Sequence, residues 1–517
     1  MFAEDFPIPG PKNSTERALL YFLCGITILL SWAMGGEPFW AMVLSTALCI
    51  AGPVIFIFHW RSGYSTQRRP LLLYTLLMAP VWVALTAFFV GLSNPGIIEL
   101  SVGRVEYLAL NQTGRWLPTL SDWHAAWAST AFTVVAVAAF LPIMLLVESR
   151  WVIHRILLVL GVNAVLLAVL GYVMYFTGFD NMFGLVAERA DPGFSLFLSA
   201  ERWSAYALVW TGVLLGLACY DKFTIPWGQF LRWNGLLELV GAVVLGSSVY
   251  VTGSPWAIGA VSILFALTLG YLAYDHHIVE KGKLLRWPGT FALAALTIAA
   301  ALGGTQVTYD AIRGDAPEPP LQVDAVQSPG ASAQLDLRVV NGPSGKQSRF
   351  RGAVEMMEAR PAFGWGPGSY GRVYAFFQEV DLREPYYTLA STTLAQSLAE
   401  RGLVGTGSWL LMGAGILWML TRTRNRVRWM THFLLMALGM VAVLALVETP
   451  FATPATFFSF WVVVCLAVRW TTIEAAPRST AGQPTRLVFT EAEMQPISET
   501  AGAKARSAAA GTPVVQD

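Results

Sequence analysis

The sequence predicts an all-α, polytopic integral membrane protein with about twelve transmembrane helices and one large extracytoplasmic loop. Three observations lead to this fold class. The 517 residues are 55% hydrophobic and only 13% charged, which is too apolar for an ordinary soluble protein. Apolar runs recur with about the twenty residues that a helix needs to cross a bilayer. Lysines and arginines gather in every second connection between those runs, the pattern of the positive-inside rule.

The apolar runs define the predicted spans. Each run is nearly free of charged residues and is close to the length of one bilayer crossing. In chain order they are Ala18–Met34, Phe39–Phe58, Leu71–Leu92, Ala125–Val147, Ile156–Phe176, Ala205–Tyr220, Gly235–Val251, Pro255–Tyr274, Thr290–Val307, Leu403–Leu420, Met430–Val447 and Pro454–Val468.

Positive charges assign the two sides of the membrane. Connections rich in lysine and arginine are predicted to be cytoplasmic, and they contain Arg61, Arg68, Arg69, Arg150, Arg155, Lys222, Arg232, Lys281, Lys283, Arg286, Arg422, Arg424, Arg426 and Arg428. Both termini are then cytoplasmic. The expected organisation is a cytoplasmic N-terminus (1–17), nine spans (18–310), a large periplasmic loop (311–402), three more spans (403–470) and a disordered cytoplasmic tail (471–517).

Charge and cysteine content exclude several classes of function. The net charge of +1 gives no reason to expect a nucleic-acid partner. All four cysteines lie within apolar runs, which indicates small buried hydrophobic residues rather than a disulfide framework or a metal cluster; they are Cys24, Cys49, Cys219 and Cys465.

One polar stretch, residues 349–405, holds most of the functional signal. It begins with a basic run that is predicted to be helical. A glycine-rich turn follows at residues 364–371. Because no strand-then-helix unit surrounds this turn, its literal G-x-G-x-x-G pattern does not indicate a dinucleotide site. A helix is predicted from about Ser391 to Gly402, where glycine favours a helix C-terminus.

Two motifs in this stretch resemble those of the O-antigen ligase and polymerase family of bacterial membrane glycosyltransferases. Residues 360–370, RPAFGWGPGSY, are similar to the family's P-x-x-G-x-G-P-G-S-F turn. Residues 394–405, LAQSLAERGLVG, are similar to the end of its H-N-x-x-L-x-x-L-x-E-x-G-x-x-G helix. Counting back from Glu400, the family's His-Asn pair falls on Ser391-Thr392, so the histidine is absent. A family arginine at the outer end of the seventh span corresponds to Pro255.

The resemblance implies a protein of the bacterial inner membrane that transfers a glycan from an undecaprenyl-diphosphate-linked donor in lipopolysaccharide or other surface-polysaccharide biosynthesis. It implies no metal and no other cofactor. The expected partners are a lipid-linked oligosaccharide or polysaccharide, membrane lipids and polysaccharide-assembly proteins, with no nucleic acid. The missing histidine leaves a second hypothesis open, a catalytically degenerate member that binds the lipid-linked glycan or scaffolds an assembly complex. A transporter is a third hypothesis, although the spans lack a matching pair of broken helices.

A diphosphate leaving group needs cations, and arginine suits this task because its planar fork binds phosphate oxygens bidentately. Arg202 is the foremost candidate, because it stands where a long outer connection re-enters the membrane. The alternative for each candidate is an interfacial anchor or the partner of a nearby carboxylate. The predicted outer candidates are Arg202, Arg349, Arg351, Arg360 and Arg372.

A transferase also needs a base for the acceptor hydroxyl. His124 is the single histidine on the predicted outer side, two residues after Asp122. Ser391 is another catalytic candidate, although a serine hydroxyl acts as a base only with an activating partner. A carboxylate could come instead from Glu400, Glu379, Asp381 or Glu384, among which the sequence does not choose. The alternatives are an interfacial role for His124 and a helix N-cap for Ser391.

The predicted helix after Ser391 carries one polar stripe. Thr392, Gln396 and Glu400 follow one another at intervals of four residues, so they share a helix face. This stripe is expected to face a substrate cavity. An amphipathic helix lying on the membrane would give the same pattern.

Overall fold

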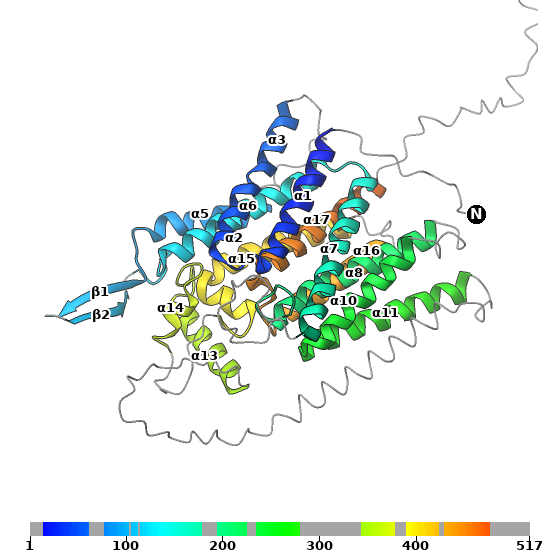
Figure 1. Ribbon diagram of the computed structural model, residues 1–517. Helices are drawn as coiled ribbons and strands as arrows, with labels where there is room; N and C mark the ends of the chain where they lie inside the picture. Colours follow the sequence, from blue (N-terminus) through cyan, green and yellow to red (C-terminus); the bar gives the residue numbers. More distant parts are fainter. Residues whose placement is uncertain are drawn as a thin grey trace, which may run out of the picture. The chain divides into compact units, whose positions relative to one another are not determined.

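The computed structural model describes residues 14–61, 77–102, 105–111, 114–177, 194–224, 234–279, 343–377, 389–422 and 429–475. Figure 1 shows these residues as a bundle of helices with one two-stranded sheet. The predicted ninth span, the part of the large loop before residue 343 and the tail after residue 475 lie outside the described residues.

Eight helical segments of the described chain are long and apolar enough to cross a membrane, and three shorter apolar helices accompany them. Every predicted span that falls within the described residues coincides with one of these segments. The chain therefore has the architecture of an all-α polytopic membrane protein. The segments are α1 (Ser14–Trp32), α2 with α3 (Phe39–Cys49 and Ala51–Arg61), α5 (Ala79–Gly91), α6 (Trp123–Leu146), α7 (Arg150–Thr177), α8 (Ala200–Thr224), α10 (Asn234–Thr252), α11 (Pro255–Val279), α15 (Thr393–Arg422), α16 (Trp429–Leu444) and α17 (Pro454–Ala475).

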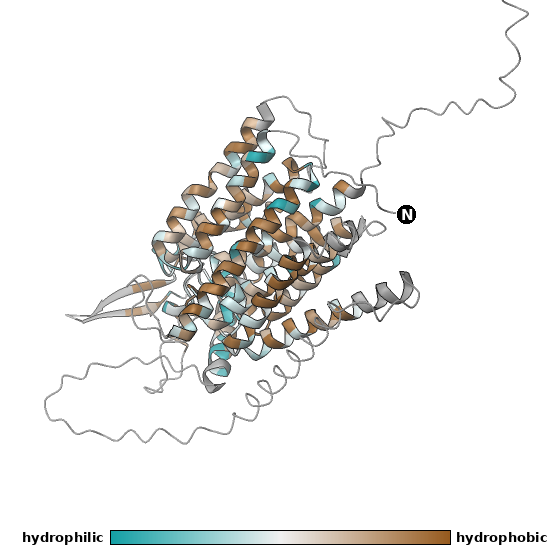
Figure 2. Ribbon diagram, turned by 45° about the vertical axis from the view of Figure 1, so that its right-hand side comes forward, coloured by the Kyte–Doolittle hydropathy of each residue, from teal (hydrophilic) through white to brown (hydrophobic). Residues whose placement is uncertain are grey.

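Helix α8 forms the core of the bundle. Its aromatic residues Trp203, Tyr206 and Trp210 are fully buried, and it packs against α7, α10, α16 and α17. Other helices keep large apolar side chains on the outside, such as Tyr21 at 72% and Phe176 at 79% exposure. Apolar residues accordingly colour the helices on several faces in Figure 2. Exposed apolar surface of this extent suits contact with lipid rather than water.

Predicted outer connections meet at one end of the bundle. Glu37, which follows α1, forms an ion pair with Arg202 in the first turn of α8. Glu37 also accepts a hydrogen bond from Thr453, just before α17, at 2.9 Å. Glu448, after α16, accepts a hydrogen bond from Ser254, between α10 and α11, at 2.8 Å.

Predicted cytoplasmic connections meet in the same way. Glu16 at the start of α1 accepts the backbone N–H groups of Glu148 and Ser149 at 2.7 and 2.8 Å. Arg469 near the end of α17 donates to the carbonyl of Val147. Contacts therefore join outer connections to outer ones and cytoplasmic connections to cytoplasmic ones, as the charge pattern predicts.

Cysteine labelling tests the direction of the chain across the membrane. The four native cysteines are buried, so their background labelling is expected to be low. Ser93 and Glu148 are both exposed and lie in connections of opposite predicted sides. In intact cells, Ser93→Cys is expected to react with an impermeant maleimide, and Glu148→Cys only after the membrane is opened. Reaction of both variants from the same side would contradict the topology.

The described fold contains a β-hairpin that the sequence analysis does not predict. Strand β1 (Ile97–Val102) pairs antiparallel with β2 (Val105–Leu110), with Ile97 opposite Leu110. Figure 1 shows it extending from the connection between α5 and α6. The strands contain Ile, Val and Tyr, which favour extended backbone, and each strand is far shorter than a bilayer span.

Candidate functional site

The two motifs of the 349–405 stretch are joined through their backbones. Helix α15 is broken at Gly402, whose φ of 63° and ψ of −168° are not helical. A break leaves backbone N–H and carbonyl groups without helical partners, and the turn after Arg360 provides them. We call these four hydrogen bonds the interlock: Trp365 N–H to Ala399 O at 3.1 Å, Gly366 N–H to Glu400 O at 2.8 Å, Leu403 N–H to Pro361 O at 2.8 Å and Val404 N–H to Ala362 O at 2.9 Å.

Glycine is needed at two positions where the backbones touch. Gly364 has a φ of +65°, and a Cβ atom there would lie 2.5 Å from the carbonyl carbon of Glu400. A Cβ atom on Gly402 would lie 2.4 Å from the carbonyl oxygen of Ala362. The predicted tight turn is therefore confirmed. The predicted end of the helix at Gly402 is a break, after which α15 continues to Arg422.

Glu400 holds the turn in place. Its buried carboxylate accepts the backbone N–H groups of Gly368 at 2.9 Å and Tyr370 at 3.3 Å. It also accepts Nε2–H of Gln396 at 3.2 Å, one helical turn earlier. The predicted polar stripe thus faces the glycine turn and the start of α14 (Tyr370–Tyr374). A carboxylate with three N–H donors is a positioning group for this turn.

Arg360 and Arg115 fasten α13 (Pro343–Ala359) to the connection between α5 and α6. Arg115 donates to the carbonyls of Glu358 and Ala359 at the end of α13. Arg360 donates in return to the carbonyls of Asn111 and Gly114, and its guanidinium lies 4.7 Å from the ring centroid of Trp365. Burial lowers the pKa of Arg360 from its ordinary value. Arg360 therefore holds backbone carbonyls, although the sequence offered it as a phosphate ligand.

His124 and Arg372 lie beside the same residue, Asp122. Asp122 is the N-cap of α6 and accepts the N–H of Ala125 at 3.1 Å. Arg372 on α14 approaches its carboxylate at 3.8 Å and keeps half of its side chain exposed. His124, in the first turn of α6, is exposed. Arg372 on α14 and His124 on α6 are therefore both accessible from the outside.

Arg349 and Arg351 both lie on α13. Arg351 is exposed and pairs with Glu355 one turn later at 3.0 Å. Arg349 is partly buried, and its backbone carbonyl accepts the hydroxyl of Tyr370 at 2.9 Å. Burial, together with the neighbouring Tyr374, raises the pKa of Tyr370, so this phenol remains a neutral donor.

Ser391 lies at the start of α15, as predicted, but Thr392 is the residue that caps the helix. The hydroxyl of Thr392 accepts the N–H of Ala395 at 3.1 Å. The expectation that Ser391 is the N-cap is therefore wrong. Its own hydroxyl is buried and has no hydrogen-bond partner within the described part of the chain. The next residue, Thr393, donates its N–H to the carbonyl of Glu448 at 2.9 Å, so Ser391 lies near the cluster around Glu448 and Ser254.

Arg202 is partly buried in an ion pair. Its side chain is 17% exposed and that of its partner Glu37 is 13% exposed. Two residues later on α8, Ser204 hydrogen-bonds the hydroxyl of Thr252 at 2.7 Å. This partner, distant in sequence, gives Arg202 a structural role at the outer end of the bundle.

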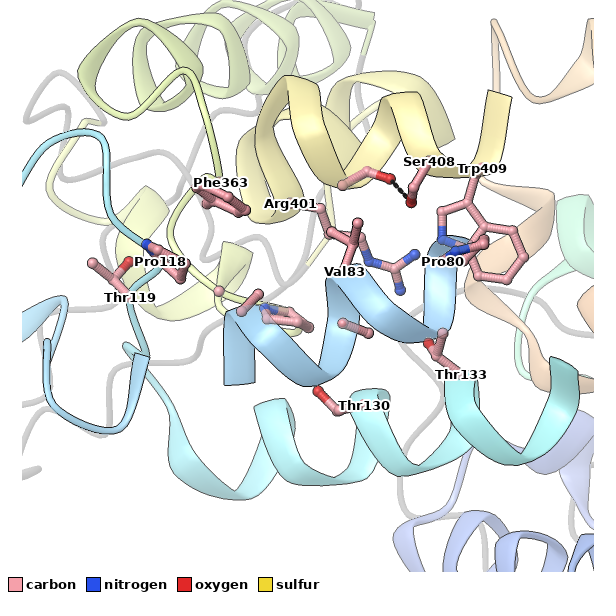
Figure 3. A pocket seen from close by; sticks show the side chains of 15 residues that line it. Pro80, Val83, Pro118, Thr119, Thr130, Thr133, Phe363, Arg401, Ser408 and Trp409 are labelled. Carbon is pink, nitrogen blue, oxygen red and sulfur yellow. Dashed lines mark hydrogen bonds between the residues drawn. The ribbon is translucent and has the colours of Figure 1, made fainter. Parts of the chain in front are cut away.

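Sequence reasoning missed one cation, Arg401. It lines a cleft between α5, α6 and α15 that is partly open to the surroundings. Figure 3 shows its guanidinium entering this cleft alongside Val83, Thr133 and Trp409. The sequence carries the signal, because Arg401 directly precedes a predicted span.

The described contacts divide the predicted site residues into groups. Glu400, Gln396 and Thr392 lie along the outer part of α15, and Arg372 approaches Asp122, two residues before His124. Arg202 belongs to a separate cluster with Glu37. Neither the family models nor the curated proteins give a match to the chain.

Proposed function

We propose that the protein handles lipid-linked glycans as an O-antigen ligase-like protein of the bacterial inner membrane. An undecaprenyl-diphosphate-linked glycan would bind at the outer face formed by α13, α14 and the first part of α15. The observation that carries the proposal is the interlock. The two segments that resemble the family's motifs form one unit through backbone hydrogen bonds, with Glu400 tying the turn to the helix.

Binding without transfer is the form that we favour. Ser391 occupies the position of the family's histidine, and a serine hydroxyl is no general base without an activating partner. Glu400 is already engaged with Gly368, Tyr370 and Gln396. In this role the protein would present the glycan to polysaccharide-assembly proteins.

Transfer is the second candidate, and His124 is the observation in its favour. The imidazole is exposed two residues after Asp122, whose carboxylate lies 3.8 Å from a guanidinium nitrogen of Arg372. An imidazole beside a cation could accept the proton of an acceptor hydroxyl while the cation holds phosphate.

A binding titration tests the proposal. The full chain in nanodiscs is expected to bind an undecaprenyl-diphosphate-linked oligosaccharide more tightly than either undecaprenyl phosphate or the free oligosaccharide. Arg372→Gln should weaken the binding about tenfold, as expected for one lost charge-assisted hydrogen bond. Arg155→Gln is the matched control, since Arg155 is exposed over Trp151 at the predicted cytoplasmic end. Equal affinity for all three ligands would contradict the proposal.

A second experiment separates binding from transfer. Ser391→His with Thr392→Asn restores the family's pair, and asparagine retains the N-cap. A general base contributes about 10²–10⁴-fold to a rate, so the double variant should transfer glycan to lipid A-core or another acceptor at least a hundredfold faster than wild type. A wild type as fast as the double variant would refute the binding-only form. In that case loss of activity in His124→Ala would identify the base.

A further inference from the structure

The cleft around Arg401 has the composition of a binding site for an amphiphile. Its walls are mainly apolar, with Val83 and Ala87 from α5, Phe363 from the turn and Trp409 from α15. Arg401 is the one charged residue among its lining residues. Gly405, one turn further along α15, leaves room for this side chain, because a Cβ atom there would lie 2.5 Å from Cβ of Arg401.

Arg401 has unused hydrogen-bonding capacity. A guanidinium carries five N–H donors, and in the described chain Arg401 makes one long hydrogen bond, to Ser129 Oγ at 3.4 Å. Its neighbour Glu400 attracts it electrostatically, but the carboxylate of Glu400 is itself bonded to the turn. A guanidinium at the edge of a membrane span and among apolar residues is stabilised by any further anion or polar group that reaches it.

A second polar group in the cleft also lacks a partner. Thr130 on α6 is 2% exposed, and its hydroxyl makes no hydrogen bond to any described residue. The other three hydroxyls that line the cleft are satisfied by backbone carbonyls, namely Thr119 by Gly364, Thr133 by Ser129 and Ser408 by Gly405. A buried hydroxyl without a partner is unfavourable, and Thr130 lines the same cleft as Arg401, which indicates a ligand.

Helices α6 and α15 also line a second groove, which is purely apolar. Beyond Thr133, α6 presents Val137, Phe140 and Met144 to an open apolar groove, and α15 contributes Met412 and Ile416. From Thr130 to Met144 the lining runs roughly 20 Å along α6 at 1.5 Å per residue. This length exceeds half of a hydrocarbon core of about 30 Å, enough for the chain of one leaflet.

We propose that Arg401 and Thr130 bind the phosphate of an anionic glycerophospholipid, whose acyl chain lies between α6 and α15 toward Met412. Charge selects this class of lipid. One guanidinium complements the single negative charge of a phosphodiester, whereas a prenyl diphosphate carries more charge than the cleft can neutralise. The inference does not rest on the proposed function, because Arg202, Arg349, Arg351 and Arg372 do not line the cleft.

Native mass spectrometry of the full chain tests the proposal. After delipidation and addition of phosphatidylglycerol, wild type is expected to retain one lipid, and Arg401→Ala should weaken this binding at least tenfold. Thr130→Val should weaken it about threefold to tenfold. Thr133→Val is the matched control, because the hydroxyl of Thr133 is satisfied within its own helix, and it should bind like wild type.

Other outcomes would overturn the proposal. Diacylglycerol with the same chains should bind at least tenfold more weakly, and glycerol phosphate should not compete. Equal binding of diacylglycerol, competition by glycerol phosphate or preference for undecaprenyl diphosphate would each refute the assignment. If Arg401→Ala does not fold, the Thr130→Val and Thr133→Val pair decides. Equal phosphatidylglycerol binding by those two variants would overturn it.

Discussion

Replacing Gly402 by alanine is expected to lower the free energy of unfolding by about 2–6 kcal/mol. Gly402 has a φ of +63° and a ψ of −168°, a conformation that costs another residue about 1–3 kcal/mol. The added Cβ atom would also lie 2.4 Å from the carbonyl oxygen of Ala362, and relief of such an overlap costs about 1–3 kcal/mol more. Denaturant titration in mixed micelles would measure the change.

Gly407→Ala is the matched control in the same helix. A Cβ atom on Gly407 would meet no atom within 4 Å, and alanine favours a helix by about 0.5–1 kcal/mol over glycine. This variant is expected to be neutral or slightly stabilised. If both glycine variants lost stability equally, the loss could not come from the interlock.

Replacing Arg202 by alanine is expected to destabilise the protein by about 2–4 kcal/mol. Removing one member of a fully buried ion pair costs about 3–5 kcal/mol, because the other charge remains buried and unpaired. A smaller loss of stability is expected here, because the side chains of Arg202 and Glu37 remain 17% and 13% exposed. Denaturant titration in mixed micelles would measure the loss of stability. The double variant Arg202→Met with Glu37→Leu should recover most of it.

Arg351→Ala is the control for this effect. Arg351 and Glu355 form an exposed i,i+4 pair, with side chains 69% and 37% exposed, and such pairs contribute about 0.3–0.5 kcal/mol. Full stability of Arg202→Ala combined with lost lipid-diphosphate binding would favour the ligand role of Arg202 over its structural one.

The spans were predictable because they depend on local properties. A run of about twenty apolar residues allows few alternatives, and the glycine turn at residues 364–371 is likewise encoded in its own sequence. The β-hairpin was not predictable in the same way. Its strands are too short for a membrane span. Residues between two predicted spans are interpreted as a connection, and the apolar pattern does not indicate whether that connection contains strands.

The partners of charged residues could not be predicted from one sequence. Arg202 meets Glu37 across 165 positions, and Arg360 reaches the carbonyl of Asn111 across 249. The neighbouring sequence does not distinguish an arginine that donates to backbone carbonyls from one that binds phosphate. For the same reason Glu400 was a catalytic candidate until its three N–H donors were known.

The contacts of Glu37 also bear on the order in which the chain assembles. The interlock joins residues less than fifty positions apart, so it closes a short loop and can form as soon as α15 has been synthesised. Thr453 contacts Glu37 across 416 positions, so this bond must wait until the chain has been synthesised as far as Thr453. The polar cluster around Glu37 thus joins the beginning and the end of the membrane bundle, and its completion coincides with the arrival of the last helix.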